Sequence, residues 1–419
     1  MIYRLRRWSA ALLLGMFLSL LSILQCFAAG NVSQVNLHIG QTPDAVYLTY
    51  SAPDAAQGAF SVTGPKGTAD YAANHVWSDS AGKYLYSAKV DGLAPDTNYT
   101  YNIAGSYSGT FKTPAETGAF TFAFLTDTQI GFAADAKATG AMFSLLNSCD
   151  DLAFAYIAGD MTDSSHNERQ WEMLFENGGV NAGAGQTFFG SHLIAAAQGN
   201  HDNSSFSGHI TAPCANSGVG PVVYAFDYSN VKFVVLNMNN PGTWAAQADF
   251  LRQQAADAKN NGKSGIISAR KFWAPLLAEL GVDLVLQGHD HVYARGFVTS
   301  TGSNANLTAE NNTYHTVSGV PLYITGGHSG AVKWYAARNY QISAGDPLTP
   351  NYSFLDINSA APAKNPWGTD TSKTHEQTYI LINVNGDTMT ISTYMFRYDG
   401  ISDKMATPPY LYDSLTITR

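Results

Sequence analysis

Charged side chains are scarce in this sequence, and positive ones are scarcer than negative ones. Only 13% of the 419 residues are charged, and the formal net charge is −9. Nucleic acids and anionic membranes are bound by clusters of Lys and Arg, so this charge balance argues against both as partners. Disorder is also excluded, because 45% hydrophobic residues provide enough apolar surface to offset chain entropy. The length predicts two domains.

Long hydrophobic runs are confined to the N-terminus, where the basic start RLRR precedes AALLLGMFLSLLSIL and the small residues of QCFAAG. This layout is typical of a secretory signal peptide over residues 1–29, with an uncleaved membrane anchor as the alternative. The run is short for a spanning helix. We therefore expect a secreted or cell-surface protein that keeps no membrane attachment after cleavage.

Cysteine is rare, with three in the chain, and Cys26 would leave with the signal peptide. Cys149 and Cys214 would then remain in an oxidising compartment. They either pair or stay as two separate buried thiols, and the sequence leaves both possibilities open.

Residues 30–114 contain short alternating segments such as AVYLTY and YLYSAKV between Gly, Pro, Asn and Asp turns. This pattern predicts an antiparallel β-sandwich. The stretch from Tyr86 to Pro114 resembles the end of a fibronectin type III domain, which places a buried tyrosine where Tyr99 stands. Another small β-sandwich is the alternative.

Residues 115–419 alternate apolar strands with helical segments, which predicts a layered α/β domain. A loop-rich stretch is expected over 301–375, and the C-terminal tail is expected to add closing β-strands.

Four of the apolar segments end in metal-compatible residues: Asp127 and Gln129, Asp160, Asn200 with His201 and Asp202, and His289 with His291. Strand ends in such a sheet converge on one edge, so these side chains are expected to meet. Mixed oxygen and imidazole donors suit Mn, Fe, Zn or Co.

The motifs LTDTQ, GDMTD, GNHD and GHDHVYAR, in this order, resemble the calcineurin-like metallophosphoesterases. The resemblance is to the secreted purple acid phosphatase branch, which carries an N-terminal fibronectin-like domain. It implies a four-layer α/β/β/α sandwich after the β-sandwich, two divalent metal ions, and hydrolysis of a small phosphorylated substrate.

The resemblance also implies a role for each motif residue. Asp160 would bridge the two metals, since closely spaced dications need shared negative charge. Asp127 and His291 would hold the first metal, with Gln129 nearby, and Asn200 and His289 would hold the second. The catalytic pair would be His201, which binds the phosphate or protonates the leaving oxygen, and Asp202, which orients the His201 ring.

Two positions depart from the family pattern. Gln129 stands where many relatives have a histidine, and a neutral amide is a weaker ligand. Asp163 stands where purple phosphatases have a tyrosine, so neither colour nor a firmly held ferric ion is expected. Asp163 is either a helix cap or a ligand.

The third departure is larger. Relatives place a buried strand that ends in a metal-binding histidine before the GHDH motif, and here GIIS near 263–266 looks too short to replace it. No histidine lies between His209 and His289. We therefore expect both the strand and the ligand to be missing, leaving unpaired backbone groups. Possible stand-ins are His209 and His328, both expected in surface loops.

Arg295 either contacts an anionic substrate or pairs with a carboxylate. The remaining histidines are interpreted as surface or hydrogen-bonded residues. The leading hypothesis is a secreted metal-dependent phosphoric-ester hydrolase. The alternatives are a degenerate member that binds phosphate or metal without turnover, a gene record lacking a segment, and an adhesion module carried by the β-sandwich.

Overall fold

The computed structural model describes most of the chain, namely residues 32–202, 205–213, 218–220, 222–261, 264–267, 273–289, 291, 293–301, 305, 307–330 and 376–419. The proposed signal peptide, Cys214 and the larger part of the 301–375 stretch lie outside the described residues. None of the helices in the described ranges is long and apolar enough to cross a membrane.

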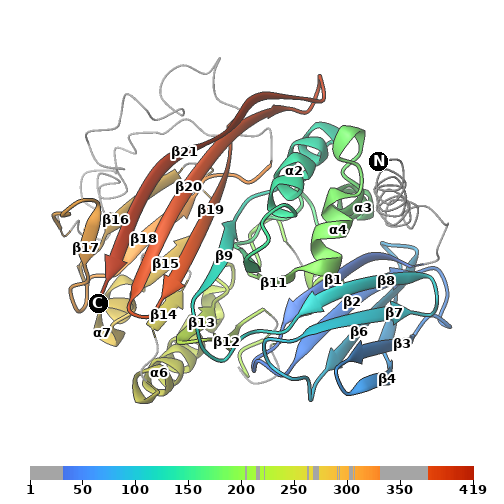
Figure 1. Ribbon diagram of the computed structural model, residues 1–419, viewed down its shortest axis with the longest axis horizontal. Coiled ribbons are helices and arrows are strands. Elements are labelled where there is room, and N and C mark those ends of the chain that lie inside the picture. The colour runs from blue at the N-terminus through green and yellow to red at the C-terminus, as the bar shows by residue number, and fades with distance from the viewer. Residues whose placement is uncertain are drawn as a thin grey trace, which may run out of the picture.

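The described strands form one long sheet that runs through most of the molecule (Figure 1). Its order is β17 (Thr313–His315), β21 (Lys404–Thr418), β20 (Thr388–Asp399), β19 (Glu376–Asn385), β9 (Phe120–Leu125), β10 (Leu152–Ile157), β11 (Leu193–Ala196), β1 (Ser33–Ile39), β2 (Val46–Ala52), β6 (Lys83–Val90) and β5 (Asn74–Ser78). Strands β9, β10 and β11 are parallel, so their carboxyl ends lie at one edge. The predicted closing strands are present as β19, β20 and β21.

A second sheet packs against the first and has the order β12 (Tyr224–Tyr228), β13 (Val231–Val235), β14 (Ser264–Ile267), β15 (Leu284–Gln287), β18 (Leu322–Gly326) and β16 (Tyr293–Phe297). Strands β13, β14, β15 and β18 are parallel, whereas β12 and β16 run antiparallel to their neighbours. Helix α6 (Trp244–Asn260) connects β13 to β14, and α7 (Ala274–Leu280) connects β14 to β15, whereas β16 and β17 lie between β15 and β18 in the chain.

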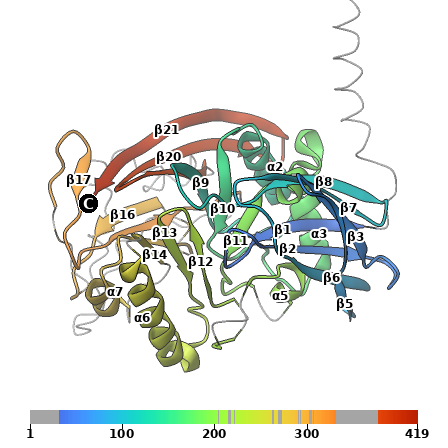
Figure 2. The same ribbon diagram turned by 60° about the horizontal axis from the view of Figure 1, so that its bottom comes forward.

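The helices lie on the outer faces of the two sheets. On the long sheet they are α2 (Ala133–Leu146), α3 (Glu168–Glu176) and α4 (Ala184–Ser191), with the short η2 (Gly179–Asn181) and α5 (Phe206–His209) nearby; on the second sheet they are α6 (Trp244–Asn260), preceded by η4 (Pro241–Thr243), and α7 (Ala274–Leu280). Figure 2 shows α6 and α7 on the side of the molecule away from α2 and α3.

Strand β9 shows why the layers form. Its residues FTFAFL alternate, so that Phe122 and Phe124 enter the core between the sheets while Ala123 and Leu125 enter the core under the helices. In the core between the sheets, the ring of Phe122 lies 5.4 Å from that of Phe233 on β13, edge to face. A strand buried on both faces is typical of a parallel sheet covered on two sides.

The N-terminal strands form two sheets, as the β-sandwich prediction requires. The first is the β1–β2–β6–β5 part of the long sheet, and the second has the order β4 (Gly67–Ala72), β3 (Ala59–Gly64), β7 (Asn98–Ile103) and β8 (Tyr107–Lys112). Tyr99 is buried, and its hydroxyl accepts a hydrogen bond from the backbone nitrogen of Ala94 (2.8 Å). The assignment to the fibronectin type III class stays a prediction.

The two units share a sheet, which the sequence did not indicate. Strand β1 pairs in parallel with β11 through Leu37 opposite Leu193 and His38 opposite Ile194. The domain boundary expected near Pro114 is therefore a boundary in the sequence only, because strands from both sides of it are hydrogen-bonded within one sheet.

The expectation that a strand is missing before GHDH is wrong. Strand β14 occupies the position between β13 and β15 and pairs in parallel with both. Four residues are enough there because each neighbour supplies hydrogen-bond partners along one side. The backbone of the sheet is therefore continuous, and the loss concerns only the histidine.

Candidate metal-binding site

The sequence-predicted donors follow four strand ends from both sheets. Asp127 and Gln129 follow β9, Asp160 follows β10, and Asn200 lies beyond β11. His289 and His291 follow β15 in the second sheet. The two sheets face each other, so these loops meet at one edge of the molecule, as expected for the carboxyl ends of parallel strands.

Asp127 lies at the contact between the sheets. Both of its carboxylate oxygens accept from the backbone nitrogen of His289, at 3.0 and 2.8 Å. The Nε2 atom of His291 lies 3.4 Å from Oδ1 of Asp127. Two donors bound at about 2.1 Å to one ion are separated by about 3 to 3.5 Å. This pair therefore has the spacing of two ligands on one metal.

A second pair forms beside the first. Nδ1 of His289 lies 2.7 Å from the side-chain oxygen of Asn200. Oδ1 of Asp160 accepts from the backbone nitrogen of His201 (2.8 Å), and the Asp160 carboxylate is close enough to Asp127 and His289 to interact electrostatically with both. These contacts bring Asp127 together with His291 and Asn200 together with His289, and the metal-binding roles of the four residues stay a prediction.

Five of the six predicted ligands have a left-handed backbone. Their φ angles are 52° at Asp127, 36° at Gln129, 49° at Asp160, 79° at His289 and 51° at His291. This conformation is uncommon for residues with a side chain, and it costs of order 1 kcal/mol or more at each position. Its concentration at the strand ends is typical of a functional site.

Glycines allow the loops to approach this closely. A Cβ atom on Gly288 would lie 1.8 Å from Oγ1 of Thr126 and 2.5 Å from Oδ2 of Asp127. On Gly199 it would lie 2.1 Å from Oδ1 of Asp160. Gly288 in GHDH and Gly199 in GNHD are thus required because a larger residue at either position would collide with a carboxylate oxygen.

The carboxylates are held close together at a cost in free energy. Burial, followed by the negative charge of Asp127, raises the pKa of Asp160 to about 6, although the backbone nitrogen of His201 opposes this. Burial also raises the pKa of Asp202 to about 7. Buried carboxyls that repel each other are stabilised by a nearby cation, which is the electrostatic environment of a metal site.

The ring of His201 is oriented by Asp163, which corrects the expectation that Asp202 does so. Nδ1 of His201 donates to the backbone oxygen of Asp163 (2.7 Å), and Nε2 accepts from the amide of Gln129 (2.8 Å). The carboxylate of Asp202 instead accepts from the backbone nitrogens of Gly199 and Met161. Asp202 therefore braces the loop that carries His201.

Asp163 is also not the cap of the following helix. The side chain of Asn167 caps α3 by accepting from the backbone nitrogen of Arg169. Oδ1 of Asp163 accepts from the Gln129 amide at 3.0 Å. The sequence hinted at this contact only through the position of Asp163, three residues after Asp160, the proposed bridging carboxylate.

Gln129 provides a test of whether the residues fit a metal. Its oxygen Oε1 is buried and has no hydrogen-bond partner among the described residues. An orphaned buried acceptor beside carboxylates and imidazoles fits a cation. The described side chains do not include a ready cluster of three His, Cys, Asp or Glu that could hold an ion. The candidate donors thus lie in pairs, and side chains from more than one pair would have to move closer together to bind one ion.

Arg295 pairs with a carboxylate, which resolves the alternative left open above. Its Nε and Nη2 donate to the two oxygens of Asp413, at 2.6 and 3.1 Å, and the hydroxyl of Tyr293 donates to the same carboxylate. Burial opposes the charge of Arg295, but the hydrogen bonds with Asp413 raise its pKa. The substrate-binding role proposed for Arg295 is therefore not supported by its contacts.

Neither stand-in histidine is in a surface loop. His209 is buried, its ring stacks on Trp171 at 4.4 Å, and its Nε2 lies 3.3 Å from Oε2 of Glu168. Burial lowers its pKa to about 3. Its Nδ1 lies 3.2 Å from Oε1 of Gln34 in β1, so His209 lies at the junction between α3 and the N-terminal strands. His328 is fully buried beside His291.

Two further expectations concern groups away from the site. His38 is buried and hydrogen-bonded, as expected. Cys149 forms no disulfide with another described residue, and because Cys214 lies outside the described residues the proposed pairing stays open.

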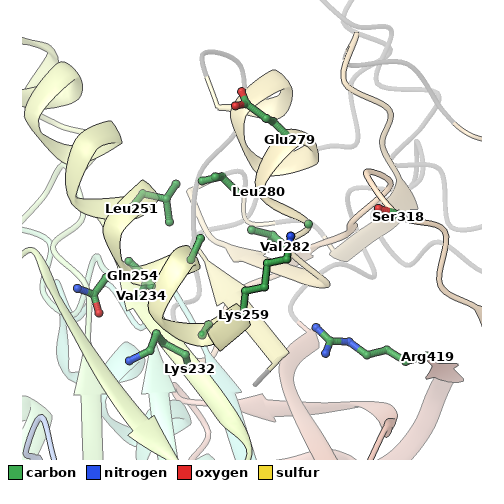
Figure 3. Close-up of a pocket in the computed structure, with 13 residues that line it drawn as sticks. Lys232, Val234, Leu251, Gln254, Lys259, Glu279, Leu280, Val282, Ser318 and Arg419 are labelled. Carbon is green, nitrogen blue, oxygen red and sulfur yellow. The ribbon is translucent and has the colours of Figure 1, made fainter. Parts of the chain in front are cut away.

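A cavity of about 330 Å³ lies elsewhere, at the amino ends of β13 and β15 (Figure 3). Among its lining residues, Lys232 pairs with Asp227 and Asp257, and Arg419 pairs with Asp283. The donors described above follow the opposite, carboxyl ends of the strands. The cavity therefore does not belong to the candidate metal site.

The chain is similar to solved structures. No protein-family model and no curated protein matches it. It matches the purple acid phosphatase PPD1 from seeds of yellow lupin (Lupinus luteus) with a TM-score of 0.65 and 14% identity, over 93% of this chain and 75% of that chain.

Two weaker matches have TM-scores below 0.5. Vacuolar Protein Sorting 29 from Cryptosporidium parvum matches with a TM-score of 0.33 and 13% identity, over 72% of this chain and all of that one. GAP50, the anchor in the inner membrane complex of Plasmodium, matches with a TM-score of 0.37 and 13% identity, over 70% and 89% of the chains. The likeness to the lupin phosphatase shows that this chain has a mixed α/β fold resembling a metallophosphoesterase.

Proposed function

We propose that the protein is a secreted metal-dependent phosphoric-ester hydrolase. The observation that carries the proposal is the meeting of Asp127, Asp160, Asn200, His289 and His291 at one edge, in the two pairs that a two-metal site would need. The layering of helices and sheets supports the finer assignment to the four-layer α/β/β/α class. The N-terminal strands would form its fibronectin-like domain.

In this proposal Asp127, His291 and Gln129 would hold one divalent ion, Asn200 and His289 would hold the other, and Asp160 would be shared by both. When bound, such ions activate a water molecule and neutralise phosphate oxygens. Iron, manganese and zinc fit the donors better than calcium does.

His201 would act on the substrate through its ring. The hydrogen bond from Nδ1 to the Asp163 oxygen sets the tautomer, so Nε2 is the atom that accepts or delivers a proton. Gln129 now donates to Nε2. If Gln129 turned to present Oε1 to a metal, Nε2 would become available to the leaving oxygen.

The experiment is to measure metal content and hydrolysis of a chromogenic phosphate ester by the purified mature chain. We expect up to two metals per chain, and turnover that Asp160→Asn lowers by about 100-fold or more. Asp283→Asn is the matched control, because Asp283 is a partly buried carboxylate that pairs with Arg419.

Hydrolysis that persists in a folded Asp160→Asn protein, or a wild-type chain that binds less than one metal and shows no turnover, would reject the proposal. Circular dichroism of each variant confirms that it is folded.

A second candidate function is binding without turnover. It is favoured by the sequence between His209 and His289, which contains no histidine to complete the Asn200–His289 side. Calorimetric titration with orthovanadate separates the two candidates. Binding with a metal but without ester hydrolysis supports the second.

A further inference from the structure

The imidazole of His328 lies inside the molecule next to the proposed ligands. His328 follows β18, the neighbour of β15 in the second sheet, and none of its surface is exposed. Its ring centre lies 6.0 Å from that of His291, with the planes tilted by 37°. His291 in turn contacts the Asp127 carboxylate, so His328 belongs to the same cluster of side chains at the strand ends.

The segment GGHSG that carries His328 fits tightly against three neighbouring elements. A Cβ atom on Gly326 would lie 2.8 Å from the ring of Phe124 in β9, and one on Gly330 would lie 1.9 Å from Oγ1 of Thr139 in α2. Gly327 has φ +82° and packs against Thr378 in β19. Small residues are therefore required around His328, and the segment cannot shift without moving a sheet strand.

Ser329 fastens the same segment to the end of β9. Its backbone nitrogen donates to the oxygen of Thr126 (2.8 Å), and its Oγ accepts from the nitrogen of Thr126 (3.0 Å). Oγ also donates to the backbone oxygen of Thr378 (2.8 Å). Because Thr126 precedes Asp127, these bonds fix His328 relative to the Asp127 carboxylate.

The spacing of the rings suits a shared ion. A metal-bound imidazole places its ring centre about 3 Å from the ion, so two rings on one ion have centres at most about 6.5 Å apart. The 6.0 Å between His291 and His328 falls within that reach. Oδ1 of Asp127 lies 3.4 Å from Nε2 of His291, so the Asp127 carboxylate would be a third donor to such an ion.

We infer that His328 is a ligand of the metal held by Asp127 and His291, an inference that rests on the proposed function. The donor set on that side becomes one carboxylate, two imidazoles and the neutral oxygen of Gln129. Two imidazoles favour Zn²⁺, Co²⁺ or Cu²⁺ over magnesium and calcium. The described residues add no such donor to the Asn200–His289 side, so we expect the first ion to be bound much more tightly than the second.

The test titrates the metal-free mature chain with Zn²⁺ in a calorimeter. For the wild type we expect one tight and one weak site. His328→Asn, which keeps a polar side chain of smaller size, is expected to weaken the tight site by about 100-fold or more. His209→Asn, a buried histidine paired with Glu168, is the matched control and should leave both sites unchanged.

A second measurement can already decide on the wild type alone. Pulsed electron paramagnetic resonance of the wild type with one equivalent of Cu²⁺ should count two coordinated imidazoles, and one in His328→Asn. A single imidazole in the wild type, or an unchanged tight site in folded His328→Asn, overturns the inference while leaving metal binding by the protein intact. A wild type that binds no Zn²⁺ rejects the proposed function itself.

Discussion

Single residues at the strand ends adopt conformations that the rest of the fold must support. Asp127, Asp160, His289 and His291 all have positive φ. Such strain persists only where surrounding contacts determine the conformation. One of those contacts is the hydrogen bond that the backbone nitrogen of His289 donates to the Asp127 carboxylate. Their residue types follow from the sequence, but their conformation follows from the loops that they close.

A residue-scale prediction concerns His38, which is fully buried at the seam between β1 and β11. Its Nε2 accepts from the backbone nitrogen of Ala196 (3.1 Å), and burial lowers its pKa from 6.5 to about 4. The unfolded chain binds a proton below about pH 6.5 that the folded chain excludes, so stability falls as pH drops toward 4.

The side chain of His38→Gln can still accept the hydrogen bond from Ala196. When the pH is lowered from 7 to 4.5, we expect the free energy of unfolding to fall by about 2 kcal/mol less in His38→Gln than in the wild type. Urea unfolding at both pH values measures this. Tyr224→Phe removes a neighbouring hydroxyl but keeps His38, so its pH dependence should match the wild type. Equal slopes for His38→Gln and the wild type would contradict the assignment.

At the scale of elements, the site depends on how β15 approaches β9. These strands belong to different sheets, and the contact between their ends is made by Gly288 against Thr126 and Asp127. The same edge of the second sheet includes β18, which brings His328 beside His291. The order of strands in the second sheet therefore decides which imidazoles reach Asp127.

Replacing Gly288 by Ala tests this contact. The added methyl would overlap Oγ1 of Thr126, so the end of β15 must move away from β9. We expect a loss of stability of about 1 to 3 kcal/mol and metal affinity lower by at least about 10-fold. Gly242→Ala is the control, because its nearest atom would be 3.3 Å away. Calorimetry would contradict the argument if Gly288→Ala bound Zn²⁺ as tightly as Gly242→Ala.

At the scale of the whole molecule, the N-terminal strands and the α/β part depend on each other. Besides the β1–β11 pairing, the side chain of Gln186 bonds both backbone groups of Val35, at 3.2 and 3.0 Å. The hydroxyl of Tyr101 donates to the buried backbone oxygen of Gly190 (2.8 Å). Removing the N-terminal strands would expose the edge of β11 and leave these groups unpaired.

We therefore expect residues 115–419, expressed alone, to lack a cooperative unfolding transition and to aggregate. Urea unfolding monitored by circular dichroism, together with size-exclusion chromatography, tests this against the mature chain. A monomer with a single sharp transition would show that the shared sheet is dispensable. If the expectation holds, deleting residues 30–114 is not a clean test of an adhesion function.

The sequence by itself determined the candidate donor residues, their order and their positions after apolar strands, because strand periodicity and turn chemistry are local properties. It also indicated the buried Tyr99. Tertiary structure alone decided that four residues suffice for β14, that β1 joins β11, that Asp163 rather than Asp202 holds the His201 ring, and that Arg295 is bound by Asp413. Each of these depends on which distant segment lies across from a residue, and pairing between segments far apart in the chain is set by the packing of whole sheets.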